Sequence, residues 1–217
     1  STRPDLMGLE TCEHLQKLQD DIKPFSSSVA KKIIEHEIQK PIEDIFTIFN
    51  KIPIATASVA QVHFGTLENG HEVAIKLLKP NIEKLLFQDF IFFYWISKCF
   101  EFFMPKVKRL KLSKNVEVLS EISLNELDLT MEASAADELA ENFKNHPKYR
   151  VPKIYWELTN KKMLVLEYID GIKINDISKL QRDKHNIDKI TEVGTEVFFL
   201  QVFRDGFFHG DMHPGNI

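Results

Sequence analysis

Cysteine is scarce in this sequence of 217 residues, which contains only Cys12 and Cys99. Two cysteines so far apart match neither a disulfide framework nor a zinc motif, so both are interpreted as reduced thiols of a cytosolic compartment. The sequence also shows no internal repeat, no low-complexity tract and no signal-peptide pattern at its start. Its formal net charge of −4 at pH 7 argues against a generic nucleic-acid-binding protein, so no nucleic-acid partner is expected.

Long hydrophobic runs are missing as well. The most hydrophobic stretch, residues 90–97, lies between Asp89 and Lys98 and is far shorter than the roughly 20 residues of a bilayer-spanning helix. Two interpretations fit it: a buried helix, or a helix that lies on a membrane surface. We expect the buried helix. Phe102, Phe103 and a basic run would suit the second interpretation, although a basic run alone is often only solvated. The run comprises Lys106, Lys108, Arg109, Lys111 and Lys114.

The clearest chemical motif is the final stretch, residues 209–217, which reads His-Gly-Asp-Met-His-Pro-Gly-Asn-Ile. It matches the catalytic loop of a kinase-like phosphotransferase. In such loops an aspartate orients the attacking hydroxyl and an asparagine five residues later holds a magnesium ion, a spacing that Asp211 and Asn216 reproduce. A polar surface turn, or a metal site built from His209, Asp211 and His213, would also account for parts of the motif.

An apolar strand with one central lysine lies upstream. Residues 72–78 read Glu-Val-Ala-Ile-Lys-Leu-Leu and resemble the Val-Ala-Ile-Lys strand of kinases. The turn Asn69-Gly70 predicts that residues 58–65 form the other arm of a β-hairpin. In kinases this lysine reaches the nucleotide phosphates and a helical glutamate holds it, which makes Lys76 the candidate. A lysine at the margin of an amphipathic strand would look the same.

The approach to this hairpin has alanine where protein kinases have glycine. Kinases cover the phosphates with Gly-x-Gly-x-x-Gly, but the corresponding candidate residues are Ala55, Thr56, Ala57 and Ser58. Because alanine disfavours positive φ, we expect a stiffer loop whose amides wrap less closely around a triphosphate. Nucleotide handling should therefore differ from that of a standard kinase.

Together these features resemble the UbiB family of atypical kinases, a group associated with ubiquinone biosynthesis. The resemblance extends over essentially the whole chain. It is carried by Ser-Thr-Arg-Pro-Asp-Leu at 1–6, Leu-Gln-Asp at 18–20, the alanine-rich loop, the Lys76 strand, Glu126-Leu-Asp128, Glu132-Ala133 and the final motif.

The resemblance implies ATP and magnesium as cofactors and a role for each matching residue. These are Lys76 as phosphate contact, Glu132 as its ion-pair partner, Asp211 as catalytic aspartate, Asn216 as magnesium ligand, and Glu126 with Asp128 as a regulatory signature. In the family an inhibitory Lys-x-Gly-Gln element precedes the matching start, and a second magnesium ligand follows the final motif. We therefore expect this chain to be a fragment, inactive by itself. Ala135 stands where the family usually has asparagine.

Residues 116–143 show a helical pattern with an irregularity near Asn125. At about 100° per residue, Glu126 and Glu132 point to different sectors, so both could reach one ligand only across a break or bend. Each acid by itself would also fit a solvated helix face. The apolar stripe consists of Leu119, Ile122, Leu127, Met131, Ala135, Leu139 and Phe143.

Residues 162–171 predict an apolar strand followed by a hinge between two lobes. We expect adenine to bind there through the backbone of Glu167, Tyr168 and Ile169. A further helix is predicted over residues 186–205.

The expected fold is α+β and protein-kinase-like. A family-specific helical region covers residues 1–50, and residues 51–168 form an N-lobe with an antiparallel sheet and a helical insertion at about 81–125. Residues 169–217 form the start of a C-lobe, which is incomplete.

Three functions are compatible with these residues. The first is a UbiB-type kinase or ATPase at the cytoplasmic side of the bacterial inner membrane or its mitochondrial equivalent, with lipid or quinone intermediates and other ubiquinone-biosynthesis proteins as partners. The second is a small-molecule phosphotransferase of the aminoglycoside or choline kinase kind, which shares the final motif but not the alanine-rich loop. The third is a non-catalytic scaffold that binds nucleotide or lipid.

Overall fold

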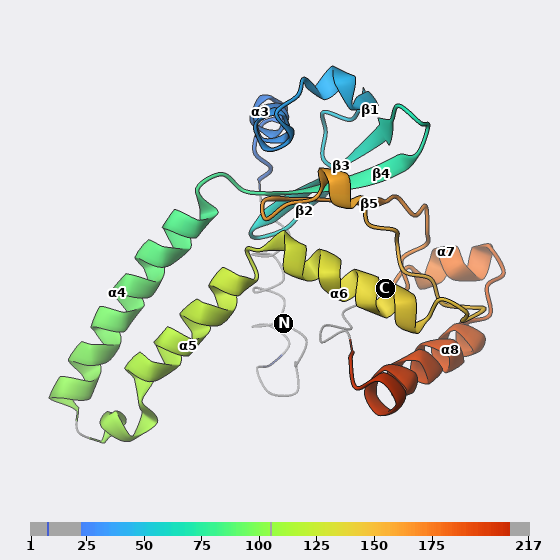
Figure 1. Ribbon diagram of the computed structural model, residues 1–217. Helices are drawn as coiled ribbons and strands as arrows, with labels where there is room; N and C mark the ends of the chain where they lie inside the picture. The colour runs from blue at the N-terminus through green and yellow to red at the C-terminus, as the bar shows by residue number, and fades with distance from the viewer. Residues whose placement is uncertain (1–7, 9–22, 105, 209–217) are drawn as a thin grey trace.

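The computed structural model describes residues 8, 23–104 and 106–208, and it is built around one antiparallel sheet (Figure 1). The strand order is β1-β3-β4-β5, and the short β2 pairs with β3. The strands are β1 (Phe46–Phe49), β2 (Ala55–Thr56), β3 (Ala60–Leu67), β4 (Glu72–Leu78) and β5 (Met163–Glu167).

The β3–β4 hairpin is the centre of the sheet. Its pairing runs without interruption from Ala60 opposite Leu78 to Thr66 opposite Glu72. Gly70 closes the turn with φ +81°, a conformation that a side chain disfavours. The hairpin predicted from Asn69-Gly70 is therefore confirmed.

Helix α3 (Ser27–Ile38) covers one face of the sheet (Figure 1). Ala30 and Ile34 are completely buried there, against the β4 side chains that point to the same face. Because side chains alternate along a strand, every second residue of β4 joins this layer. The β4 residues are Val73, Ile75 and Leu77.

Helix α6 (Leu129–Asn142) lies on the opposite face. Its buried Leu129 and Ala133 pack into a second core with Leu78 of β4 and Leu164 of β5. The sheet is thus the middle layer between two helices, and any polar side chain of β4 that points toward α6 lies beside the start of that helix.

Two long helices leave this body as a hairpin. Helix α4 (Ile82–Phe103) runs outward, the 3-10 turn η2 (Val107–Leu110) follows, and helix α5 (Leu112–Asn125) returns (Figure 1). Three residues, 126–128, separate α5 from α6. The irregularity expected near Asn125 is therefore a complete break between two helices.

The break overturns part of the stripe predicted for residues 116–143. Leu119, Ile122 and Met131 were expected on the inner side of one helix, but more than half of each residue's surface is exposed. Leu127, Leu139 and Phe143 of the stripe are buried as expected, but the break changes the angular phase of the chain, so α6 also buries Leu129 and Ala133, which the stripe did not include. The buried-helix interpretation of residues 90–97 is also wrong, because Phe92, Phe93 and Trp95 are exposed.

The last described part is helical. After β5 come α7 (Ile177–Arg182), α8 (Ile187–Phe199) and the π-helical turn η4 (Leu200–Asp205), which continues α8, whereas the 3-10 turn η3 (Trp156–Leu158) precedes β5. The helix predicted over residues 186–205 is confirmed. Gly206 ends it with φ +64°.

Candidate nucleotide-binding site

Lys76 lies in the middle of β4, between Ile75 and Leu77. Those two neighbours point to the α3 face and are completely buried, so alternation directs Lys76 to the α6 face. Its side chain keeps 27% of its surface exposed. The strand therefore fixes the lysine stem, while the ammonium group stays within reach of a ligand.

Glu132 lies in the first turn of α6. Asp128 caps this helix, because its carboxylate accepts a hydrogen bond of 3.0 Å from the backbone N–H of Thr130. The first turn is docked on the sheet by Leu129 and Ala133, on either side of Glu132. A carboxylate in a first turn also interacts favourably with the helix dipole.

The structure brings Lys76 and Glu132 into contact. The lysine Nζ donates to both carboxylate oxygens, at 2.8 Å to Oε1 and 2.6 Å to Oε2. An ammonium group has three N–H donors, and two of them are used by this carboxylate. The geometry leaves a third donor for an anionic oxygen such as that of a phosphate.

The two acids of the expected regulatory signature differ in their surroundings. Asp128 caps α6 and also pairs with Lys161 at 3.4 Å. The hydrogen bonds from Thr130, together with Lys161, lower the pKa of Asp128 against a smaller opposing effect of burial. Glu126 caps the end of α5 through its backbone and has an exposed side chain.

The alanine-rich loop forms a short strand and a tight turn. Ala55 and Thr56 make up β2, opposite Val62 and Gln61 of β3. The backbone N–H of Ala57 donates to the carbonyl of Ala60 at 2.8 Å. That amide is already bonded within the sheet, which agrees with a loop less able to wrap a triphosphate.

The predicted hinge follows β5, and two of its backbone donors are already bonded. The N–H of Glu167 donates to the carbonyl of Lys153 at 2.8 Å, and the N–H of Tyr168 donates to the carbonyl of Glu72 at 3.0 Å. The Glu167 carboxylate pairs with Arg150. Adenine would therefore have to use other backbone groups of the segment, including the N–H of Ile169.

The predicted catalytic-loop residues His209, Asp211, His213 and Asn216 lie outside the described residues. Within the described ranges, no three His, Cys, Asp or Glu side chains are grouped to hold a metal ion. Asp211 as catalytic aspartate and Asn216 as magnesium ligand therefore stay predictions.

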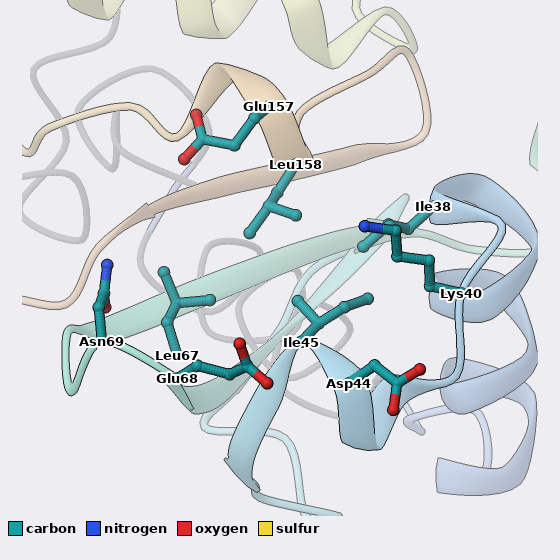
Figure 2. Close-up of a pocket in the computed structure, with 9 residues that line it drawn as sticks. All are labelled: Ile38, Lys40, Asp44, Ile45, Leu67, Glu68, Asn69, Glu157 and Leu158. Carbon is teal, nitrogen blue, oxygen red and sulfur yellow. The ribbon is translucent and has the colours of Figure 1, made fainter.

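One cavity lies on the other face of the sheet from the Lys76–Glu132 contact. It measures about 460 Å³. Figure 2 shows Lys40 and Asp44 on the side of α3 and the 3-10 turn η1 (Ile42–Asp44), and Glu157 with Leu158 on the η3 side. Ile45 and Leu67, which line it, belong to the core under α3, so this cavity is separate from the lysine site.

Sequence reasoning did not single out a buried polar pair on β3. Gln61 and His63 are completely buried and bonded to each other through their Nε2 atoms at 2.7 Å. The only sequence signal was two polar residues at alternate positions of a strand, which normally marks a solvent face.

A strand lysine held by a first-turn glutamate from a helix on the same sheet is the arrangement of a kinase-like nucleotide-binding lobe. The chain matches the family described as ABC1 atypical kinase-like domain over residues 17–217. It therefore belongs to this family, and the α+β, protein-kinase-like fold expected from the sequence is confirmed.

Curated relatives carry the family name expected from the resemblance. The chain is 44% identical to a Marinobacter nauticus protein named probable protein kinase UbiB, over 100% of this chain and 40% of the relative. A Cellvibrio japonicus protein of the same name is 41% identical, over 100% of this chain and 39% of the relative. The chain thus spans about two fifths of the length of these relatives.

A solved structure with a similar fold is the complex of Rv3197 from Mycobacterium tuberculosis with erythromycin. Its TM-score is 0.65 and its sequence identity is 26%, over 98% of this chain and 52% of that chain.

Proposed function

We propose that the protein is an atypical kinase or ATPase of the UbiB type that uses ATP and magnesium in support of ubiquinone biosynthesis. The Lys76–Glu132 contact is the observation that carries the proposal, because it positions an ammonium group for a nucleotide phosphate. The membership in the ABC1 family and the names of the relatives support it.

Each predicted site residue has one task in this proposal. Lys76 binds a phosphate oxygen, and Glu132 keeps the ammonium group from swinging away. Asp211 orients the attacking hydroxyl of an acceptor or water, and Asn216 holds magnesium. Bound ATP with magnesium supplies the transferable phosphoryl group and neutralises its charge.

The adenine end of the site is proposed at the hinge. The N–H groups of Glu167 and Tyr168 are already bonded to the carbonyls of Lys153 and Glu72. The Glu167 carbonyl and the Ile169 N–H are therefore assigned as acceptor and donor for the adenine edge. A stiff loop covers the phosphates and completes the nucleotide contacts. It consists of Ala55, Thr56, Ala57 and Ser58.

The wider role follows from the same family. We assign the protein to the cytoplasmic side of the bacterial inner membrane or its mitochondrial equivalent, with lipid or quinone intermediates and other ubiquinone-biosynthesis proteins as partners. Glu126 and Asp128 are proposed to act as a regulatory signature beside the site. We also propose that the chain is divided into a helical N-terminal region (residues 1–50), an N-lobe (51–168) and the start of a C-lobe (169–217).

The Lys76–Glu132 contact is tested by a double-mutant cycle on the affinity for magnesium-ATP. Lys76→Ala should weaken binding by roughly tenfold or more, because Glu132 is left as an unpaired negative charge beside the phosphates. Adding Glu132→Gln should recover part of that loss. Lys79→Ala is the matched control, since Lys79 lies just after the same strand, and it should leave the affinity unchanged.

Two results would contradict the proposal. Unchanged ATP affinity and turnover when Lys76→Ala is made in the full-length protein would favour a scaffold that does not need the lysine. Turnover that depends on an added aminoglycoside or choline would favour a small-molecule phosphotransferase instead.

A further inference from the structure

The α4–α5 hairpin buries its small polar residues and exposes its large apolar ones. Ser97 is the buried residue of α4, and Ser113 is the buried residue of α5. By contrast, Phe102 is 80% exposed, Phe103 76% and Trp95 64%. A helix pair that is stable in water normally does the reverse, so this apolar surface is available to something other than the hairpin itself.

The exposed surface continues along one helix and its turn. Besides Trp95, Phe102 and Phe103, α4 and its C-terminal end expose Phe87, Ile91, Phe92, Phe93, Ile96, Phe100 and Met104, and η2 exposes Leu110. So many exposed aromatic and aliphatic side chains on neighbouring turns form a patch rather than scattered single residues.

The tip of the hairpin is held in a defined shape. Glu101, near the end of α4, accepts hydrogen bonds from the backbone N–H of Ser113 at 3.0 Å and from its hydroxyl at 3.0 and 3.2 Å. These bonds lower the pKa of Glu101 and tie the end of α4 to the first turn of α5. The aromatic residues are thus presented on a fixed scaffold.

The same tip is strongly basic, although the whole chain is acidic. Among residues 95–115, Glu101 is the single acid, and its carboxylate is bonded to Ser113. Lys98 additionally lies over the ring of Tyr94, 5.2 Å from its centroid. The basic residues are Lys98, Lys106, Lys108, Arg109, Lys111 and Lys114.

The shape of the patch suits a surface contact. A hollow of about 410 Å³ has Trp95, Phe102 and Phe103 among its walls, with Lys98 and Lys108 beside them. None of the helices in the described ranges combines the length and apolar character that crossing a bilayer requires. The hairpin could therefore lie against a membrane without spanning it.

We propose that the tip of the α4–α5 hairpin is a docking surface for an anionic lipid bilayer. The aromatic side chains enter the boundary between headgroups and acyl chains, and the surrounding lysines and arginine bind the lipid phosphates. This occupant matches both properties of the tip, its apolar surface and its positive charge. The inference does not depend on nucleotide binding.

Tryptophan quenching tests the proposal, because Trp95 lies on the hairpin and Trp156 lies on η3. The chain that carries Trp156→Phe reports only on Trp95, and the matched chain that carries Trp95→Phe reports only on Trp156. Each is mixed, without nucleotide, with vesicles of phosphatidylglycerol and phosphatidylcholine whose acyl chains are brominated. Trp95 emission should be quenched and shifted to the blue, while Trp156 emission should not change.

Charge variants separate the two parts of the proposal. Replacing Lys106, Lys108, Arg109 and Lys111 with Gln should weaken vesicle binding at least about tenfold, because each basic residue contributes to binding an anionic surface. Replacing Phe102 and Phe103 with Ser should abolish the quenching of Trp95. Both variants should keep the ATP affinity of the parent chain. A result against membrane docking is therefore distinct from a result against nucleotide binding at Lys76.

Three outcomes would overturn the inference. The first is no quenching of Trp95 by anionic vesicles. The second is equal binding to pure phosphatidylcholine, which would remove the role of the basic tip. The third is a Trp95 shift that depends on protein concentration without vesicles, which would identify a second copy of the chain as the occupant.

Discussion

At the scale of single residues, His63 is held by hydrogen bonds on both sides of its ring. Its Nδ1 lies 2.8 Å from the carbonyl of Asn50, which can only accept, so Nδ1 carries the proton. Its Nε2 then accepts from the Gln61 amide, and Gln61 Oε1 accepts from the backbone N–H of Phe25 at 3.1 Å. This series of hydrogen bonds joins β3 to Phe25, two residues before α3, and it requires a neutral His63 imidazole.

Stability should therefore depend on pH through His63. Burial lowers the pKa of His63 below its ordinary value of 6.5, against a smaller raising effect of the Asn50 carbonyl. Below pH 6.5 the unfolded chain binds a proton that the folded chain does not, so the free energy of unfolding should fall as the pH falls. Urea unfolding at several pH values between 7.5 and 5 measures this dependence.

The variant His63→Gln isolates the effect. It should be less stable at pH 7.5 by about 1–3 kcal/mol, because buried hydrogen-bond partners are left unsatisfied, and its loss of stability toward acid should be smaller. His36→Gln is the control, because His36 is a surface residue of α3 that lies outside the hydrogen-bond network of His63. An unaltered pH dependence in His63→Gln would contradict the assignment.

These residues also show what sequence could and could not predict at this scale. Lys76 was predicted from an apolar strand with one lysine at its centre, and its placement beside Glu132 is seen in the structure. Gln61 and His63 were missed, because alternation assigns a polar residue to the solvent side of a strand. Only the three-dimensional partners, Phe25 and Asn50, explain why two polar side chains are buried there.

At the scale of elements, Asp128 combines a structural task with a proposed regulatory one. The structural task is the cap of α6, the helix that carries Glu132. Asparagine caps helices about as well as aspartate, whereas alanine does not. Two substitutions of Asp128 can therefore distinguish the effect of the helix cap from the effect of the negative charge.

Asp128→Ala should destabilise the protein by about 1 kcal/mol, because the hydrogen bond to the Thr130 N–H is lost. Asp128→Asn should retain most of the stability and remove only the negative charge and its pairing with Lys161. Thermal unfolding and ATP turnover, measured on both variants of the full-length protein, distinguish the effect of the cap from the effect of the charge. If turnover changes only in proportion to lost stability, Asp128 acts through the cap alone.

The break between α5 and α6 was predictable from the sequence, but the buried side of each helix was not. The irregularity expected near Asn125 was correct, and the structure shows it as a break at residues 126–128. The side of each helix that is buried was not predictable, because Leu119 and Met131 have the spacing of a core face and are nonetheless exposed. Periodicity identifies an apolar face without identifying what covers it.

At the scale of the whole molecule, the hairpin and the layered body are nearly separate in their packing. Ile82, Leu86 and Leu124 are the hairpin residues that pack against the core between β4, β5 and α6. All three lie at the base of the hairpin, so the rest of it adds nothing to that core.

Replacing residues 91–118 with a four-residue Gly-Ser turn should therefore give a chain that still unfolds cooperatively and binds ATP. The linker needs only to join two helix axes about 8–10 Å apart. The same chain should lose its binding to anionic vesicles. Leu124→Ala in the intact chain is the contrasting variant: it should lower the melting temperature, because it removes a side chain of the core. A truncated chain that fails to fold would show that the hairpin is needed by the body.

The overall arrangement was largely predictable because its parts are local. The hairpin turn at Asn69-Gly70 and the apolar β4 carry their own sequence signals, and the family resemblance supplied the rest of the topology. The outward direction of α4 and α5 had no such signal, because Phe92 and Trp95 would fit a buried helix equally well.

The length of α4 also determines how far its tip moves when its base tilts. Its 22 residues span about 33 Å, so a tilt of about 5° at the base displaces the tip by about 3 Å. Glu132 lies on α6, beyond the break at residues 126–128, and α6 is held on the sheet by Leu129 and Ala133. A displacement of the hairpin tip therefore need not move Glu132 away from Lys76.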